Sequence, residues 1–322
     1  MLKKKLLWLM ALSLLWVPCS ALCDDSVQNH PALALMSLYT DELKCEKVVI
    51  PYIVNIIAIY ELSGNRHIQE VKKYIVWYLN HLNYPDRYGL TCTIYNYEIS
   101  TSGEEKPTYG YDSVDGYAGT FLYLLNLYHL RTGDKELFNN YWDKIKGIAY
   151  LIPYLQKQDG LTIALPEDND HTKYLMDNCE AYAGVLAFQK LAKRTGKKLD
   201  LFYADTAENI RKSVLRILYN KERKNFYWAI DDKIRHVSNL SILYPDALAQ
   251  ISPIYFGLLD QDIKKKKMLW QAFKKLYKDK AKSFALEQRM IYELTQERMS
   301  KLIPRLAIPR ILPEGAPLKT GR

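Results

Sequence analysis

The sequence predicts an all-α fold, an (α/α) toroid of helical hairpins, and three observations support this. Apolar residues recur at helical spacing through most of the chain, glycines follow several of these stretches, and one acidic motif that contains tyrosine occurs twice. The 322 residues are 48% hydrophobic and 25% charged, a globular balance that excludes a disordered chain and a disulfide-dense miniprotein. We therefore expect one large helical domain.

The predicted helices form pairs that tight turns connect. Pro51 precedes the first pair, and Gly64, Gly133 and Gly196 stand where three of the apolar stretches end. Strand-forming residues lie between the pairs, so short β-hairpins are expected in the loops. The predicted helical ranges are 52–62, 66–82, 112–130, 134–155, 177–192, 199–218, 246–259, 262–277 and 283–302.

The repeated motif is the most informative feature of the sequence. Residues 112–119 read Asp-Ser-Val-Asp-Gly-Tyr-Ala-Gly, and residues 177–184 read Asp-Asn-Cys-Glu-Ala-Tyr-Ala-Gly. A Gly-Leu-Thr tripeptide precedes each copy, and a weaker third copy ends in Tyr-Pro-Asp-Ala-Leu-Ala-Gln at 244–250. Because the long loops lie only on the acidic side, the pattern favours a closed ring, with inner helices that start around one face, over an open array.

In its hairpin period, its acidic helix starts after Gly-Leu-Thr loops and its 244–250 stretch, the chain resembles the six-hairpin glycosidases over residues 31–302. The resemblance implies an incomplete or full (α/α)6 barrel, a carbohydrate substrate, and hydrolysis of a glycosidic bond by paired carboxylates. The predicted helices are fewer than a full barrel contains, which leaves the closure of the ring open.

The acids of the motif are the candidate catalytic groups. Glycoside hydrolysis requires one carboxylic acid to protonate the leaving oxygen and a second carboxylate to activate water or attack the sugar. Acids at the starts of inner helices would meet around the mouth of a ring. The candidate catalytic residues are Asp112, Asp115, Asp177, Glu180 and Asp246.

Glu180 and Asp115 are the preferred pair. Cys179 and Ala181 give Glu180 apolar surroundings, which raise a carboxyl pKa and suit the general acid. A helix start stabilises the carboxylate form, so we expect a lowered pKa at Asp115, which suits the general base. Asp246 is the alternative for either role.

Aromatic side chains are the candidate sugar contacts. The chain has 26 tyrosines, and an aromatic ring combines an apolar face with a polar handle. The predicted substrate-binding residues are Tyr111, Tyr117, Tyr182, Trp228, Tyr244 and Gln250. Further loop tyrosines near the expected mouth either contact sugar or pack: Tyr84, Tyr88, Tyr95, Tyr97 and Tyr109.

Helix capping is the competing explanation for the acids. An Asp or Glu in the first turn of a helix binds free N–H groups and complements the helix dipole without any role in catalysis. The chain would then be a non-catalytic glycan-binding or scaffold protein. A polysaccharide lyase or epimerase on the same ring is a third hypothesis.

The N-terminal segment is typical of a secretory signal. Lys3, Lys4 and Lys5 precede an apolar run over 6–17, and small residues lead to a cleavage site after Ala21. The run is short for a bilayer span, so no stable membrane insertion is expected after cleavage. We expect a periplasmic or secreted bacterial protein, with the barrel domain over 22–302 and a proline-rich tail over 303–322.

The remaining features argue against other classes of protein. The formal charge of +9 falls to +6 without the three signal lysines (9 − 3), and the basic excess over 264–282 has the spacing of a solvated helix face. That spacing and the expected export argue against a nucleic-acid partner. No Gly-x-Gly-x-x-Gly or His-Glu-x-x-His motif occurs, so no cofactor and no metal site is expected.

Overall fold

The computed structural model describes residues 30–39, 48–166 and 171–301. The expected signal segment over 1–21 and the tail over 303–322 lie outside these residues, so export and the domain boundaries stay predictions. Within the described part of the chain, no helix is both long enough and apolar enough to cross a bilayer.

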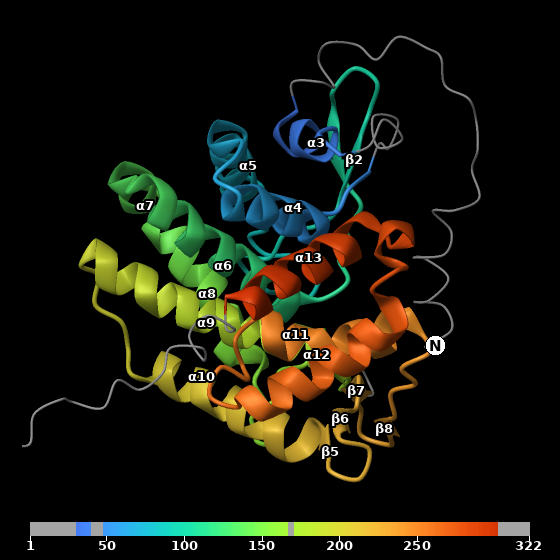
Figure 1. The fold of residues 1–322 in the computed structure, drawn as a ribbon. Helices are drawn as coiled ribbons and strands as arrows, with labels where there is room; N and C mark the ends of the chain where they lie inside the picture. Colours follow the sequence, from blue (N-terminus) through green and yellow to red (C-terminus); the bar gives the residue numbers. More distant parts are fainter. Residues whose placement is uncertain (1–29, 40–47, 167–170, 302–322) are drawn as a thin grey trace, which may run out of the picture.

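Five inner helices of the described chain form a closed ring (Figure 1). Each packs against the next inner helix, and the last packs against the first. The inner helices are α4 (Pro51–Ser63), α6 (Val114–Thr132), α9 (Leu175–Thr195), α11 (Leu248–Tyr255) and α13 (Leu286–Ser300). The closure that the sequence left open is therefore present.

The other helices pack outside this ring. α5 covers α4, α8 covers α6, α10 covers α9 and α12 covers α11. α4 and α6 are buried on most sides, whereas α5, α10 and α12 each have one apolar and one polar face, as their positions require. The outer helices are α3 (Pro31–Met36), α5 (Ile68–Asn80), α7 (Lys135–Asn140), α8 (Trp142–Leu155), α10 (Phe202–Ser213) and α12 (Ile263–Tyr277). The predicted all-α toroid is confirmed.

Some helix boundaries differ from the prediction. The stretch 134–155 is two helices because the chain breaks at Tyr141, where φ is −113° and ψ is 11°. α9 begins at Leu175 rather than at residue 177, so Glu180 lies in its second turn. The third copy of the motif enters α11 through a π-helical turn over 243–247, and α11 ends at Tyr255 because the chain then turns at Gly257, with φ +83°.

Short strands lie in the loops before inner helices, as the sequence predicted. They form two three-stranded sheets and one two-stranded sheet, all antiparallel, and Val48 pairs with Glu98 in the first. The strands are β1 (Val48–Val49), β2 (Tyr97–Ile99) and β3 (Glu105–Pro107); β4 (Lys173–Tyr174), β7 (Ala229–Ile230) and β8 (Arg235–His236); and β5 (Tyr219–Asn220) with β6 (Asn225–Phe226).

The repeated motif ends in glycine because α6 and α9 cross there. A Cβ at Gly184 would lie 2.5 Å from the Gly119 Cα, and a Cβ at Gly119 would lie 2.5 Å from the Glu180 carbonyl oxygen. Glycine at both positions lets the two backbones approach this closely. The crossing brings the start of α9 beside the start of α6, where the candidate site lies.

Candidate active site

The first turns of several inner helices meet at one end of the ring. The Tyr52 hydroxyl, in the first turn of α4, donates a hydrogen bond of 2.7 Å to Glu180 Oε1 on α9. Asp112 and Asp115, at the start of α6, lie near enough to Glu180 for their charges to raise its pKa. Carboxyl groups far apart in the sequence therefore lie together.

Glu180 is fully buried and has one oxygen without a partner. Oε1 accepts the bond from Tyr52, whereas Oε2 has no hydrogen-bond partner among the described residues. Gly116 leaves room for Oε2, because a Cβ there would lie 2.8 Å from that oxygen. Burial raises the pKa of Glu180 to about 8, and the charge of Asp115 adds to the rise, while the Tyr52 bond opposes it. Glu180 is therefore protonated at neutral pH.

Asp115 is also fully buried, but both of its oxygens have partners. The Thr162 hydroxyl donates a bond of 2.5 Å to Oδ2, and the Gly116 N–H donates one of 3.0 Å to Oδ1. Burial raises the pKa of Asp115 to about 7 in spite of both bonds. The lowered pKa that we expected from the helix start is therefore wrong in sign, because desolvation outweighs the helix dipole and the bonds.

Asp112 and Asp177 form the accessible part of the site. Asp112 is exposed and Asp177 is half-buried. Asp177 Oδ1 lies 3.5 Å from the point that a Gly116 Cβ would occupy, on the side where Glu180 Oε2 lies. Tyr244 belongs to the same group, because enclosure of its hydroxyl and the charges of Asp112 and Asp177 raise its pKa. The site thus has an accessible layer above a buried pair of carboxyl groups.

The sequence analysis missed two residues of the site, Tyr52 and Glu287. Glu287, in the first turn of α13, lies near Tyr244, whose pKa its charge raises, and burial raises the pKa of Glu287 itself. Neither α4 nor α13 carries a copy of the motif, so repetition gave no signal. The expectation that every inner helix starts at the same face would have indicated both residues.

Two predicted site residues support the third loop instead. Asp246 accepts a hydrogen bond of 2.6 Å from the Asn239 N–H. Gln250 accepts a bond of 2.7 Å from the Phe226 N–H and donates one of 3.1 Å to the Phe226 carbonyl. The structure does not bring these two side chains into the group around Glu180, and their bonds hold β6 and the following loop against α11.

The two tyrosines of the motif point to different places. Tyr117 stacks on Tyr52 with 5.9 Å between ring centres, and its hydroxyl donates a bond of 2.9 Å to Asn96 Oδ1. Tyr182 lies instead near Asp260, which follows the far end of α11. Tyr117 therefore belongs to the site, whereas Tyr182 lies near charged groups outside it, among them Arg211 on the outer helix α10.

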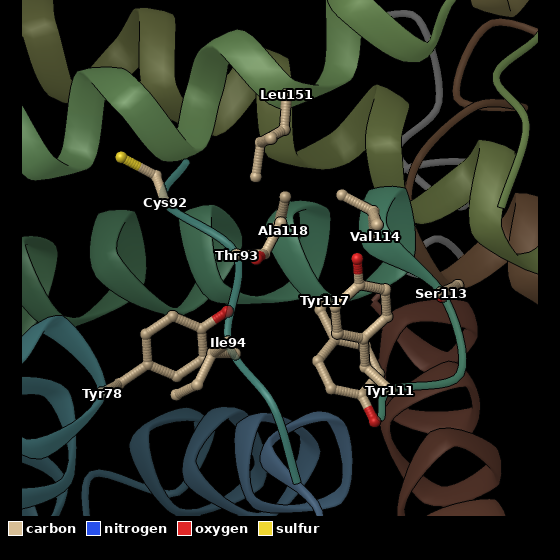
Figure 2. Close-up of a pocket in the computed structure, with 10 residues that line it drawn as sticks. All are labelled: Tyr78, Cys92, Thr93, Ile94, Tyr111, Ser113, Val114, Tyr117, Ala118 and Leu151. Carbon is tan, nitrogen blue, oxygen red and sulfur yellow. The ribbon is translucent and has the colours of Figure 1, made fainter. Parts of the chain in front are cut away.

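Tyr111 and Trp228 border the helix starts from the loops. Figure 2 shows Tyr111 beside Tyr117 at a cavity of about 10 Å³, room for about one water, and the ring centres are 6.4 Å apart. The Tyr111 hydroxyl donates a bond of 2.6 Å to Asp86 Oδ2. Trp228 stacks at 6.1 Å on Tyr174, the residue before α9.

Capping accounts for part of the role of Asp115 but not for Glu180. The N-cap residues are Ser113 for α6 and Tyr174 for α9, and neither side chain makes a capping bond. Asp115 does satisfy one free N–H, that of Gly116. Glu180 lies in the second turn of α9, beyond the free backbone N–H groups of the first turn, so it does not cap the helix.

Other chemistry has little support at this end of the ring. Within the described residues, no group of three or more His, Cys, Asp or Glu side chains is placed to hold a metal ion. Cys179, next to Glu180, is a buried free thiol, and burial raises its pKa well above the ordinary range. A thiol held neutral in this way is a poor nucleophile.

The closed ring of helical hairpins has the fold of the six-hairpin glycosidases, although the described residues supply five inner helices rather than six. Two solved rhamnosidases share it: the GH78 family enzyme of Bacillus sp. GL1, with a TM-score of 0.54 and 13% identity, and the enzyme of Klebsiella oxytoca with rhamnose bound, with a TM-score of 0.54 and 10% identity. The alignments cover 88% and 89% of this chain but only 30% and 56% of the two rhamnosidases. No protein-family model and no curated protein matches the sequence. The likeness shows a fold found in carbohydrate-active enzymes.

Proposed function

We propose that the protein is a glycoside hydrolase in which Glu180 is the proton donor. The observation that supports this most directly is the environment of its carboxyl group, which is buried and has Oε2 free of a partner among the described residues; this burial raises the pKa of Glu180 to about 8. A general acid must hold its proton at the pH of the reaction and present it to the leaving oxygen. The rhamnosidases that share the fold are glycosidases by name.

The hydrogen bonds of Glu180 indicate which oxygen carries the proton. Oε1 accepts the bond from Tyr52, so the proton of the neutral acid belongs on Oε2. Oε2 lies beside Gly116, and Asp177 lies near the same point. The proton therefore lies on the side of Glu180 that faces Gly116 and Asp177, although Oε2 itself is buried.

Asp112 and Asp177 supply the second carboxylate. Both are accessible, whereas Asp115 is buried with both oxygens bonded. The role of base, which the sequence analysis gave to Asp115, moves to this pair. Asp115 helps to keep Glu180 protonated through its charge. The substrate is a polysaccharide or oligosaccharide, met outside the cytoplasm if the expected signal segment operates.

The test is cleavage of a panel of bacterial and plant polysaccharides by the purified chain and its variants. Glu180→Gln should lower turnover by about 10²- to 10⁴-fold, the usual contribution of a positioned acid or base, and a loss of this size in either Asp177→Asn or Asp112→Asn identifies the second carboxylate. Asp246→Asn is the matched control, because Asp246 occupies the position of Asp112 in the third copy yet lies outside the carboxyl group cluster.

Each outcome of this experiment separates two hypotheses. Glycan binding without cleavage would support a non-catalytic glycan-binding protein. Unchanged turnover in the Glu180→Gln variant would show that Glu180 is not the proton donor. An unsaturated product that absorbs in the ultraviolet would indicate a lyase.

A further inference from the structure

Four tyrosines on the loops between α5 and α6 form a group of rings that we call the aromatic shelf: Tyr88, Tyr95, Tyr109 and Tyr111. Tyr109 is exposed and Tyr88 is half-buried, whereas Tyr95 and Tyr111 are buried. Tyr95 lies at its centre: its ring centre is 5.6 Å from that of Tyr109 and 5.8 Å from that of Tyr111. The Tyr95 and Tyr111 rings are nearly parallel. Tyr88 lies 5.9 Å from Tyr111 on another side. The shelf therefore joins four residues of two separate loops.

Tyr109 is the most accessible ring of the shelf, and its backbone is strained. Its side chain is 59% exposed, and its φ is +55°, a left-handed conformation that a bulky residue seldom adopts. Residues kept in such conformations cluster at ligand-binding and active sites. An exposed aromatic ring in a strained backbone is poorly explained by packing alone.

A buried carboxylate holds the shelf rigid. Asp86 accepts bonds from the Tyr111 hydroxyl at 2.6 Å, from the Tyr88 N–H at 2.8 Å and from the Thr93 hydroxyl at 2.8 Å. The Tyr95 hydroxyl accepts a bond of 2.5 Å from the Arg87 N–H. Tyr88, Tyr95 and Tyr111 are thus held in place before any ligand arrives, and Tyr109 packs against Tyr95; a support ordered in advance lowers the entropy lost on binding.

A continuous path of rings leads from the shelf to the proposed proton donor. Tyr111 lies 6.4 Å from Tyr117, and Tyr117 lies 5.9 Å from Tyr52, whose hydroxyl bonds Glu180. Residue 112, next to Tyr111, is one of the accessible acids. The rings that connect the shelf to the site are buried, and the accessible residues nearest to each other are Tyr109 of the shelf and Asp112 of the site, three residues apart in one loop.

We propose that the aromatic shelf binds a sugar unit that lies several residues away from the bond to be cleaved. The inference rests on the proposed function and adds a second binding position to it: the substrate must be long enough to reach from the bond to be cleaved to the shelf, which excludes the glycoside of one sugar. The apolar face of a pyranose lies on the Tyr109 ring, and the Tyr109 hydroxyl and the exposed Arg87 guanidinium, 4.5 Å from the Tyr88 ring centre, meet the sugar hydroxyls.

The test measures binding without turnover, on the Glu180→Gln chain. Electrophoresis in native gels that contain each polysaccharide of the same panel reports a dissociation constant through the retardation of the protein. Adding Tyr109→Ala should weaken binding at least tenfold, and Tyr109→Trp, which keeps a ring, should retain it. Tyr154→Ala is the matched control, because Tyr154 is 57% exposed on the outer helix α8. Circular dichroism checks that each variant is folded.

The outcomes separate this inference from the proposed function. If binding depends on Tyr109 but the native chain cleaves no polysaccharide, the shelf is supported and the proposed hydrolase activity is contradicted. Cleavage by the native chain together with equal retardation of the Tyr109→Ala and Tyr154→Ala variants would overturn the shelf and leave the hydrolase standing. A Glu180→Gln chain that no polysaccharide retards would also overturn the shelf.

Discussion

The Tyr52 hydroxyl lies 2.7 Å from Glu180 Oε1, although 128 residues separate the two in the sequence. The bond links the first turn of α4 to the second turn of α9 and passes beside the start of α6, which packs between these helices. It leaves the other oxygen of Glu180 as the place for the acidic proton. Tyr52 is therefore a positioning residue in the proposed reaction.

Removal of this bond should raise the pKa of Glu180 still further. Tyr52 donates to the carboxylate form and so lowers the pKa; Tyr52→Phe should raise it above its native value of about 8. A rise of about one unit or more is expected, because a hydrogen bond to a charged group contributes roughly 1.5–3 kcal/mol and one unit corresponds to about 1.4 kcal/mol. The ¹³C carboxyl shift of Glu180, assigned with Glu180→Gln, measures it.

Tyr60→Phe is the control for this substitution. Tyr60 lies on the same helix and donates a hydrogen bond of 2.6 Å to Glu293, away from the helix starts. The titration of Glu180 should not change in this variant. Equal titration curves in the Tyr52 and Tyr60 variants would mean that the bond to Glu180 has no influence on its proton.

Glu180 should make the native chain less stable as the pH rises. Its pKa is about 8 in the folded chain and about 4.3 in an unfolded one, so between these values the folded chain binds more protons and the free energy of unfolding falls with pH. Below pH about 4.3 the ionisation of Glu180 does not change the free energy of unfolding, and above pH about 8 its full destabilising effect is present. In the Glu180→Gln variant the side chain at this position cannot ionise, so its free energy of unfolding does not show this fall with pH.

Urea unfolding of the two proteins from pH 5 to pH 9 checks this prediction. The stability of Glu180→Gln relative to the native chain should rise by about 1.4 kcal/mol per pH unit and level off near pH 8. A difference that stays constant across the range would show that Glu180 is already ionised in the folded protein at neutral pH. The proposed proton donor would then be lost.

The fold was predictable because the repeated motif and the helix-ending glycines report local backbone geometry. Gly133 and Gly196 do end α6 and α9, with φ of +65° and +72°. The burial of Asp115 was not predictable, because it depends on the packing of other helices around α6. A helix start seen alone lowers a carboxyl pKa, and only the assembled ring shows that desolvation is larger.

The site was predicted as far as the motif reaches. Asp112, Asp115, Asp177 and Glu180 lie together because two copies of one motif occur on two adjacent inner helices. The third copy of the motif suggested Asp246 as a further catalytic candidate, but its carboxylate accepts a hydrogen bond from the backbone of the preceding loop. Sequence similarity between loops does not specify which way a side chain points once a π-helical turn shifts the helix start.

Gly184→Ala should destabilise the protein. The new Cβ would meet the Gly119 Cα at 2.5 Å, so α6 and α9 must move apart at their crossing. Overpacking of this kind costs about 1–3 kcal/mol. Gly110→Ala is the control, because its Cβ would have no neighbour closer than 3.8 Å. Urea unfolding that shows equal losses for both variants would mean that the crossing tolerates a side chain.

Asp260→Ala should be far more destabilising than Lys266→Met. Asp260 accepts bonds from Lys266 Nζ at 2.7 Å and from Arg298 at 2.6 Å, and it joins α12 to α13 at the far end of the ring. The Lys266 side chain is only 2% exposed, so loss of Asp260 leaves a buried ammonium without its counter-ion and should cost roughly 3 kcal/mol. Lys266→Met removes the buried charge, keeps a side chain of similar length, and should change the free energy of unfolding by about 1 kcal/mol or less. Equal losses in urea unfolding would show that the attraction between the charges, rather than the cost of an unpaired buried charge, sets their contribution.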